Sequence, residues 1–562
     1  MAVGTVQDAE QSRDRIVLPS HDEPLVRELS TIIGGPPGRF ARIGEKRWFI
    51  TPLRVLIALT VLMCAFGWAQ KEQCRDVRNW SHNGGVYQYT RMCYSDVVAL
   101  YGTEGLSSKQ VPYVDHPVEY PVLIGAVMEV ASFVAHGATP KDGADPRSAL
   151  FYDMTVLLLS LGALVTVICT GLAAGRRRIW DAALVALAPT LVLHLATNWD
   201  MIAVALASAA LLAWARKRPM LAGILLGLGM AAKLYPALFL IPLLALCLRA
   251  GRMRAWWRAA IGTVVGFVAV TLPVYIASPS FKDCPGGGAE CDAVKAGPSP
   301  WQVLTGHGDG HSFWSVLSPW HDGGSNSVMR FFQGNIRRTE DWDSLWLLLK
   351  HATGRDKGSW LSVLDRSQDM PAHAWSVPSH LNLAWEATAL VLIAAVLVLA
   401  FLAPRRPRLP QLLFLTVVAF LLASKVFSPQ YTLWLLPLWA LARPRWREFL
   451  AWQASEIVVV VTRYLYFVHL DKSGAGVSYD VFATAVVVRD LMLLFLCALI
   501  VRDILRPDRD PVRKDGIDDD PVGGVLDGVP DRYDWSGPPA PVAPPPAPPS
   551  APPDAPAFAP TG

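Results

Sequence analysis

A few polar and ionisable residues interrupt an otherwise apolar sequence, and Asp96 is the first of them that could do chemistry. It lies in residues 93–106, where the apolar residues after it predict a short amphipathic helix that begins near Asp96. A carboxylate at a helix start can cap it by accepting hydrogen bonds from free amide groups. A carboxylate near water can also act as a general base. The residues alone leave both interpretations open, the cap being the simpler one.

A second group of ionisable residues precedes the apolar segment of residues 118–136. Asp115, His116 and Glu119 stand just before the dipeptide Tyr120-Pro121. Proline is common at a helix start, so the proline itself implies no function. It does not explain three titratable groups placed against a membrane, where desolvation is costly.

Two charged residues of opposite sign follow in the apolar part of the chain. Lys233 stands in the middle of a long apolar stretch, and Asp200 ends the polar segment of residues 196–200. A lysine at the level of the lipid headgroups can bind a lipid phosphate, or it can simply extend its ammonium group to water. Asp200 is either a loop residue or an ion partner of Lys233.

Two further segments, 424–437 and 330–350, add polar groups. For residues 330–350 a solvated helix face is the simpler interpretation. The groups are Lys425 and Gln430 in residues 424–437, and Arg337 and Arg338 in residues 330–350, where aromatic and aliphatic residues predict a surface helix.

The elements that must position these residues are apolar segments of helical length. Hydrophobic residues make up 52% of the 562 residues and charged residues only 17%. Lipid cannot hydrogen-bond an open backbone, so such a series of segments predicts an all-α, polytopic transmembrane helical bundle. We expect about twelve spans, some of them too short for a straight crossing and therefore broken or re-entrant. They are 51–69, 148–174, 180–197, 200–215, 219–232, 234–248, 255–277, 382–403, 409–423, 429–442, 448–468 and 480–501.

Arginine clusters between the segments predict the orientation, because cytoplasmic loops carry an excess of basic residues. Placing all of the clusters inside puts both termini in the cytoplasm and makes the chain a multi-pass protein of the cell membrane. Residues 118–136 then form a helix on the outer surface instead of a span. The clusters are Arg39 to Arg47, Arg176 to Arg178, Arg216 to Arg218, Arg249 to Arg258, Arg405 to Arg408, Arg443 to Arg447 and Arg502 to Arg506.

This topology divides the chain into a transmembrane domain and two tails. Residues 51–502 form the domain, with two large outer loops at 70–147 and 278–381 that carry interfacial helices. Residues 1–50 form a cytoplasmic tail. Residues 503–562 are rich in proline and predict a disordered cytoplasmic tail, either a ligand for a cytoplasmic partner or an inert spacer.

Cysteine positions agree with the predicted outer loops, where the environment is oxidising. Cys74 and Cys93 fall in the first loop, and Cys284 and Cys291 in the second. We expect two local disulfides, with free thiols or a metal pair as the alternative.

Several classes of function lack their sequence signatures. There is no Walker A loop, Rossmann glycine pattern, Cys/His metal cluster or nucleophile elbow. Most basic residues are explained by topology, so nucleic acid is not implied. We expect no catalytic metal and no cofactor.

Taken together, four short motifs resemble the membrane glycosyltransferases of the GT-C class. Within that class the chain is most similar to the actinobacterial family 87, the polyprenyl-phosphate-mannose-dependent mannosyltransferases. The motifs are Ser95-Asp96-Val97-Val98, Glu119-Tyr120-Pro121, Lys233-Leu234-Tyr235-Pro236 and Ser428-Pro429-Gln430-Tyr431.

The resemblance implies a reaction on the outer face of the membrane. A sugar would pass from a polyprenyl-phosphate carrier to an envelope lipid, glycan or protein hydroxyl by an inverting single displacement, with Asp96 as general base. The donor phosphate would be bound by Lys233, Arg337, Arg338 and Gln430. The substrate cavity would include His116, Glu119, Tyr120 and Asp200, and Asp96, Glu119 and Lys233 should line one outward cavity.

Two departures from the family bear on the choice of sugar. Val122 follows Tyr120-Pro121 where the family often has a second proline, and Gln430 stands where some relatives have histidine. Arabinofuranosyl transfer therefore fits as well as mannosyl transfer. The competing function is a polytopic transporter or lipid flippase, although the sequence shows no internal repeat. A structural subunit of the envelope would leave Asp96 and Lys233 unexplained.

Overall fold

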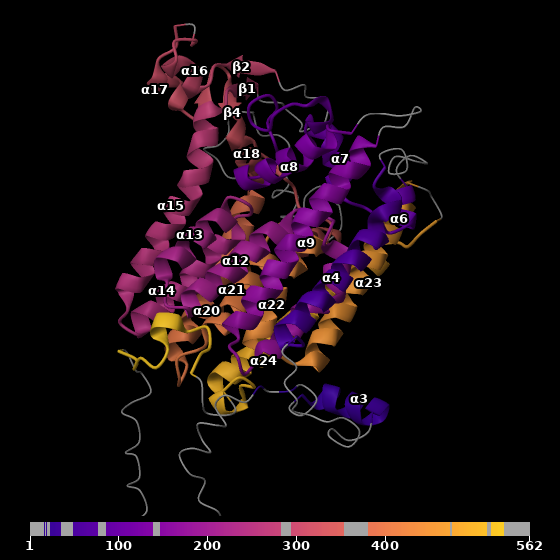
Figure 1. The fold of residues 1–562 in the computed structure, drawn as a ribbon, viewed down its shortest axis with the longest axis vertical. Helices are drawn as coiled ribbons and strands as arrows, with labels where there is room; N and C mark the ends of the chain where they lie inside the picture. Colours follow the sequence, from indigo (N-terminus) through magenta and orange to yellow (C-terminus); the bar gives the residue numbers. More distant parts are fainter. Residues whose placement is uncertain are drawn as a thin grey trace, which may run out of the picture.

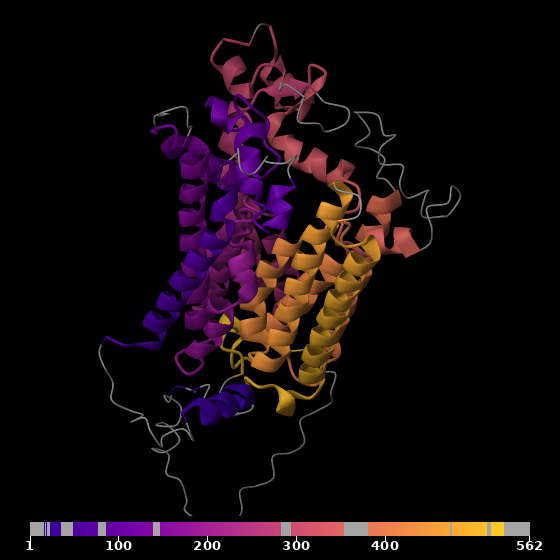
Figure 2. The same ribbon diagram turned by 90° about the vertical axis from the view of Figure 1, so that its right-hand side faces the viewer.

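Helices make up most of the computed structural model, and they lie side by side in a tall bundle (Figure 1). Figure 2 shows the same bundle from the side, with the earlier helices in indigo to magenta and the later ones in orange. The structure describes residues 16, 18, 23–34, 49–76, 86–138, 146–282, 294–308, 310–352, 380–471, 475–513 and 519–532.

Five helices in the described part of the chain are long and apolar enough to cross a membrane. A sixth helix, α23 (Trp446–Asp471), is of similar length but is less apolar. These helices support the predicted helical membrane protein, and the number of twelve spans stays a prediction. The five are α4 (Pro52–Lys71), α9 (Arg147–Ala173), α15 (Met253–Ala277), α20 (His380–Leu402) and α24 (Tyr479–Leu505).

Shorter apolar helices fill the interior of the bundle. Several begin at a proline, which suits a helix start because the N–H that proline lacks would have no partner within the helix. The segment predicted as a span at 180–197 is divided into η4 (Ile179–Ala182), α10 (Ala183–Ala186) and α11 (Pro189–His194). The others are α12 (Asp200–Ala215), α13 (Pro219–Met230), η5 (Tyr235–Phe239), α14 (Leu240–Arg249), α21 (Leu409–Ala423), η8 (Pro429–Tyr431) and α22 (Thr432–Ala442).

The segments between the long helices gather at one end of the bundle, here called the loop end. The first predicted outer loop forms η1 (Glu72–Cys74), α6 (Tyr87–Thr90), α7 (Asp96–Thr103), η3 (Leu106–Ser108) and α8 (Val122–Ala135). The second forms α16 (Pro300–Leu304), α17 (Phe313–Leu317), η6 (Ser327–Met329), α18 (Arg330–Arg337) and α19 (Leu345–Ala352).

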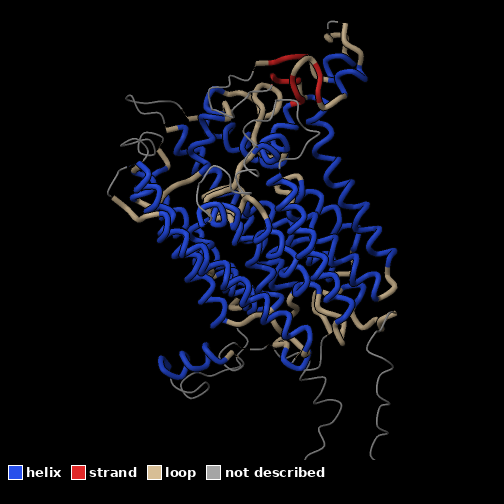
Figure 3. The backbone as a smooth tube through the Cα atoms, turned by 180° about the vertical axis from the view of Figure 1, so that it is seen from behind, coloured by secondary structure: helices blue, strands red, loops and turns tan. Residues whose placement is uncertain are grey.

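Two expectations for the second loop need correction. The loop contains a small antiparallel sheet of order β2-β1-β4-β3, so the described chain is not entirely α-helical (Figure 3). The predicted surface helix at 330–350 is also interrupted between α18 and α19, because the amide of Asp341 donates instead to the carbonyl of Lys425 at 2.8 Å. The strands are β1 (Ser280–Lys282), β2 (Lys295–Gly297), β3 (Trp320–His321) and β4 (Gly324–Asn326).

Helices α13 and α15 pack unusually close together because glycines line both faces. A Cβ atom on Gly227 would lie 2.1 Å from the carbonyl oxygen of Thr263, and one on Gly266 would lie 2.3 Å from that of Ile224. Small residues four apart let two helix backbones approach in this way within a membrane.

The opposite end of the bundle is here called the basic end. Its structure differs from the prediction that a disordered tail begins at residue 503. Residues 503–513 and 519–532 are described and pack against the helix ends, with η9 (Pro507–Arg509), η10 (Gly524–Leu526) and a buried Leu526. This segment has only scattered apolar residues, but its acids pair with arginines of the bundle. α3 (Pro24–Gly34) lies at the same end (Figure 1).

The most buried of these ion pairs joins Arg408 to Asp510, with both side chains 1% exposed and Nε 2.7 Å from Oδ2. Arg408 also donates to the carbonyls of Leu441 and Ala442 at the end of α22. Arg249 and Arg406 both pair with Asp531. Several of the arginine clusters used to predict topology therefore converge on one segment.

We expect Gly227→Val to destabilise the bundle by about 1–3 kcal/mol or more, because its side chain would collide with the backbone of α15. The measurement is thermal unfolding of the purified protein in detergent. Gly102→Ala is the matched control, since nothing lies within 4 Å of a Cβ there. An unchanged melting temperature for Gly227→Val would contradict the close packing.

We expect Asp510→Ala to cost about 3–5 kcal/mol, because it leaves the buried guanidinium of Arg408 without its counter-charge. Asp508→Ala, which removes an exposed acid two residues earlier, should leave stability nearly unchanged. Equal melting temperatures for the two variants would show that residues 503–513 do not pack on the bundle as described.

Candidate functional site

Asp96 begins helix α7, but Ser95 is the residue that caps this helix. The backbone of Ser95 is extended, and its Oγ accepts a hydrogen bond from the amide of Val97 at 3.2 Å. The half-buried carboxylate of Asp96 is therefore not needed as the cap and remains available for chemistry.

The backbone at Asp96 is anchored to the break between α11 and α12. Ser95 Oγ donates to the carbonyl of Ala196 at 2.5 Å, and the amide of Asp96 donates to the carbonyl of Thr197 at 2.9 Å. These carbonyls lie where the chain has left one helix and has not yet begun the next. These two hydrogen bonds thus satisfy carbonyl groups at the helix break, and they also fix the start of α7.

Both oxygens of the Asp96 carboxylate accept hydrogen bonds. The Tyr94 hydroxyl donates to Oδ1 at 2.5 Å, and Asn198 Nδ2 donates to Oδ2 at 2.8 Å. The negative charge of Asp96, together with burial, raises the pKa of Tyr94 well above its usual range, so Tyr94 stays a donor. Asn198 Nδ2 also donates to the Tyr120 hydroxyl at 2.6 Å.

Lys233 lies behind this group instead of in open solvent. Its Nζ is 3.3 Å from Asn198 Oδ1 and 3.6 Å from Asp200 Oδ1, and its side chain is 11% exposed. The rings of Tyr120 and Tyr431 lie 5.0 and 5.7 Å from the ammonium, close enough for cation–π attraction. Of the two interpretations of Asp200, the structure supports the second, in which Asp200 is the ion partner of Lys233.

A cavity of about 390 Å³ opens at the loop end beside Asp96. Asp96 itself does not line it, but its hydrogen-bond partners Tyr94 and Thr197 do. The remaining lining residues come from α6, α11, the segment after α18, η8 and α23. They are Tyr89, His194, Arg338, Asp341, Trp342, Pro429, Gln430, Val460, Arg463, Tyr464, Phe467, Leu470 and Asp471.

Two guanidinium groups line this cavity. Arg463 Nη1 lies 2.8 Å from Asp343 Oδ1, and Arg338 Nη2 lies 3.8 Å from Asp341 Oδ2. Burial opposes ionisation of Asp341, but Arg463 and Arg338 outweigh it and hold the pKa of Asp341 below its usual value. The two acids thus hold cations at the cavity wall. His194 Nε2 has no hydrogen-bond partner among the described residues.

The predicted site residues fall into three groups. Arg338 and Gln430 line the cavity, and Tyr120, Asp200 and Lys233 form the polar group behind Asp96. Arg337 ends α18 but is absent from the lining residues, as are His116 and Glu119. Asp96, Glu119 and Lys233, which were predicted to line one cavity, are not among the residues that line this one. Asp96 and Lys233 are joined through Asn198, and Glu119 belongs to a separate cluster.

Arg463 is the residue that the sequence reasoning missed. It lies within a predicted span, in the segment Val461-Thr462-Arg463-Tyr464, where the desolvation of an arginine is costly and the residue is therefore a functional candidate by default. Treating residues 448–468 only as an apolar span hid that signal.

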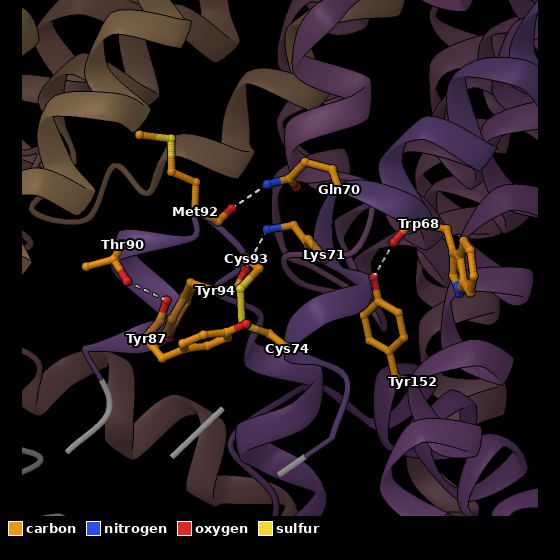
Figure 4. The surroundings of a disulfide bond; sticks show 10 residues. All are labelled: Trp68, Gln70, Lys71, Cys74, Tyr87, Thr90, Met92, Cys93, Tyr94 and Tyr152. Atoms are coloured by element: carbon orange, nitrogen blue, oxygen red, sulfur yellow. Dashed lines mark hydrogen bonds between the residues drawn. A yellow bond between two sulfur atoms is a disulfide. The ribbon is translucent and has the colours of Figure 1, made fainter. Parts of the chain in front are cut away.

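The structure joins Cys74 and Cys93 by a disulfide, with the Cα atoms 5.7 Å apart (Figure 4). Cys284 and Cys291 lie outside the described residues. Within the described part of the chain, no group of three or more His, Cys, Asp or Glu side chains could hold a metal ion.

Glu119 and His116 lie beside a buried acid, Glu104, at the C-terminal end of α7. Glu104 Oε2 lies 3.7 Å from His116 Nδ1, and Oε1 accepts from the amide of Glu119 at 3.4 Å. Burial and the Glu119 carboxylate raise the pKa of Glu104 to about 8, with Arg330 opposing the shift. Glu104 is therefore protonated in the folded protein at neutral pH.

This protonation gives a testable pH dependence. An unfolded glutamate titrates near pKa ~4.3, so between about pH 4.5 and 8 only the folded state keeps the proton and stability falls as pH rises. Glu104→Gln cannot titrate. We expect its melting temperature relative to wild type to rise from about pH 5 to pH 9, because the wild type loses at most about 1.4 kcal/mol of folding free energy per unit of pKa shift. A difference independent of pH would contradict a protonated Glu104.

Comparison with known proteins gives one match. Residues 145–283, about a quarter of the chain, match the model of glycosyltransferase family 87. The matched region includes Asn198, Asp200 and Lys233 but ends before Arg338 and Arg463. No curated protein matches the chain. The family indicates glycosyltransferase activity, and the match confirms the resemblance to family 87 and supports a GT-C class membrane glycosyltransferase.

Proposed function

We propose that this protein transfers a sugar from a polyprenyl-phosphate carrier to a cell-envelope lipid, glycan or protein on the outer face of the cell membrane. The observation that carries the proposal is the cavity beside Asp96, whose wall holds the guanidinium groups of Arg338 and Arg463. A carboxylate and two cations next to one cavity suit a reaction in which a hydroxyl loses a proton and a phosphate leaves.

Asp96 acts as the general base in this proposal. Its two hydrogen bonds, from Tyr94 and Asn198, orient the carboxylate. The acceptor hydroxyl attacks the anomeric carbon of the donor sugar while its proton passes to Asp96. The bond between the anomeric carbon and the phosphate oxygen breaks on the opposite face, which inverts the configuration.

The leaving phosphate gains negative charge as that bond breaks, and fixed cations stabilise it. Arg338 and Arg463 are the cations that line the cavity, and Gln430 offers an amide donor beside them. Lys233 is already held by Asn198 and Asp200, so we assign it to the support of the base in place of direct phosphate binding. The donor site thus keeps Arg338 and Gln430 from the sequence prediction and adds Arg463.

The chemistry of the cavity does not by itself select the sugar. We propose mannose from the resemblance to family 87, and arabinofuranose is the alternative that the same experiment separates. The basic residues at the other end of the bundle support this orientation, with the cavity proposed to open on the outer side.

We expect Asp96→Asn to lower sugar transfer by about 100-fold or more while the folded protein accumulates normally, because asparagine keeps the shape but cannot take the proton. The measurement uses purified protein, labelled polyprenyl-phosphate-mannose or polyprenyl-phosphate-arabinose, and an envelope lipid extract. Asp322→Asn, which changes another acid of the loop end, is the matched control.

Transfer that survives Asp96→Asn within a few-fold of wild type would remove Asp96 from the reaction. Absence of transfer by the wild type with either donor, together with movement of the labelled lipid across vesicle membranes, would instead favour the flippase alternative.

A further inference from the structure

The segment that leads into Asp96 is anchored at each of five consecutive residues. Cys93 is joined to Cys74 by the disulfide, and the carbonyls of Met92 and Tyr94 accept hydrogen bonds from Gln70 and Lys71. Ser95 and Asp96 are bound to the break after α11, as described above. Figure 4 shows the first three anchors meeting at the end of α4. We call residues 70–74 together with residues 92–94 the α4 clamp.

Lys71 is the least expected member of the α4 clamp. Its side chain is buried, with 1% of the residue exposed, and its Nζ donates to the Tyr94 carbonyl at 2.5 Å. Among the described residues, no carboxylate lies within ion-pair distance of it. A buried ammonium without an adjacent partner is costly, so its presence needs an explanation beyond one hydrogen bond.

Met92 shows that the α4 clamp holds the chain in a particular conformation. Its φ angle is +54°, in the left-handed region that a side chain other than glycine rarely adopts. The Gln70 hydrogen bond to the Met92 carbonyl and the disulfide at the next residue keep it there. This turn directs Tyr94 so that its carbonyl meets Lys71 while its hydroxyl meets Asp96.

We propose that Lys71 is a positioning residue for Asp96, acting through Tyr94, and that the α4 clamp as a whole sets the direction of the Asp96 carboxylate. The inference rests on the proposed function, because it concerns the base of that reaction. Lys71 fixes the backbone of Tyr94, whose hydroxyl in turn donates to the Asp96 carboxylate. Of the α4 clamp, Tyr94 lines the cavity, whereas Lys71 and the disulfide do not.

The first test compares Lys71→Met with Thr60→Val in the full-length protein. Methionine fills the space of lysine but neither donates nor carries charge. We expect kcat to fall about 10- to 100-fold with the KM for the labelled donor within about threefold of wild type, since displacement of a catalytic group slows the chemical step. Thr60 is a buried residue of the same helix that bonds only to Leu56, so its variant should keep wild-type activity.

The second test uses the backbone at Met92. Met92→Gly and Met92→Val both remove the side chain, but only glycine adopts a positive φ without strain. We expect Met92→Gly to retain sugar transfer and Met92→Val to lower the transfer rate at least about 10-fold. The peptide that contains residues 92–97 should also exchange its amide hydrogens faster in Met92→Val. Equal activity of the two variants would overturn the role of this turn.

Two measurements keep this inference separate from the proposed function. Hydrogen exchange reports whether the α4 clamp holds residues 92–97 even if no transfer is detected, and unchanged exchange in Lys71→Met would overturn the inference. If Asp96→Asn abolishes transfer while Lys71→Met keeps full kcat, the inference fails and the proposed function stands. If Asp96→Asn retains transfer, the proposed function fails first.

Discussion

The structure around the site depends on one constraint, that backbone groups in an apolar environment must find hydrogen-bond partners within the protein. The chain breaks its helix between α11 and α12, and the carbonyls of Ala196 and Thr197 are left without helical partners. Ser95 and Asp96 donate to them. The break is thus satisfied by the start of α7, and the same bonds bring the Asp96 carboxylate to the edge of the bundle.

The polar groups near that break divide into a support and a cavity wall. Asn198 is the centre of the support, because its amide nitrogen donates to Asp96 and its oxygen accepts from Lys233. The carboxylate of Asp200 balances the charge of Lys233. The cavity wall holds Arg338 and Arg463, each beside a carboxylate of the segment after α18. The cations proposed to bind the donor phosphate and the cation proposed to support the base are therefore different residues.

The basic end of the bundle shows a related use of charge. Arginines at the helix ends pair with acids of residues 503–513 and 519–532, and the pair of Arg408 with Asp510 is almost fully buried. The same arginines predict the cytoplasmic side from sequence, so charges that set topology also bind the segment that covers that end.

Much of the fold could be predicted from sequence because lipid imposes long apolar helices and proline marks their starts. The helix ends near Pro219 and Leu409 agree with the predicted spans. The role of Ser95 as the cap could not be separated from that of Asp96, because neighbouring residues compete for the same amides. The small sheet escaped prediction because its strands have only two or three residues.

The site was harder to predict because its contacts join distant parts of the chain. Asp96 and Lys233 are joined through Asn198, although neither lines the cavity, and Asn198 lies in a short polar segment that resembles any turn. Arg463 was visible as an arginine in an apolar span, yet its direction toward Asp343 depends on the unpredicted interruption after α18. Pairings of this kind require the tertiary structure.

An experimental structure with a non-hydrolysable polyprenyl-phosphonate sugar bound would test the central claim most directly. The account predicts that the phosphonate lies in the cavity between the guanidinium groups of Arg338 and Arg463, with the anomeric carbon on the side facing Asp96. A phosphonate bound at Lys233 or at the basic end of the bundle, with the cavity beside Tyr94 empty, would contradict it.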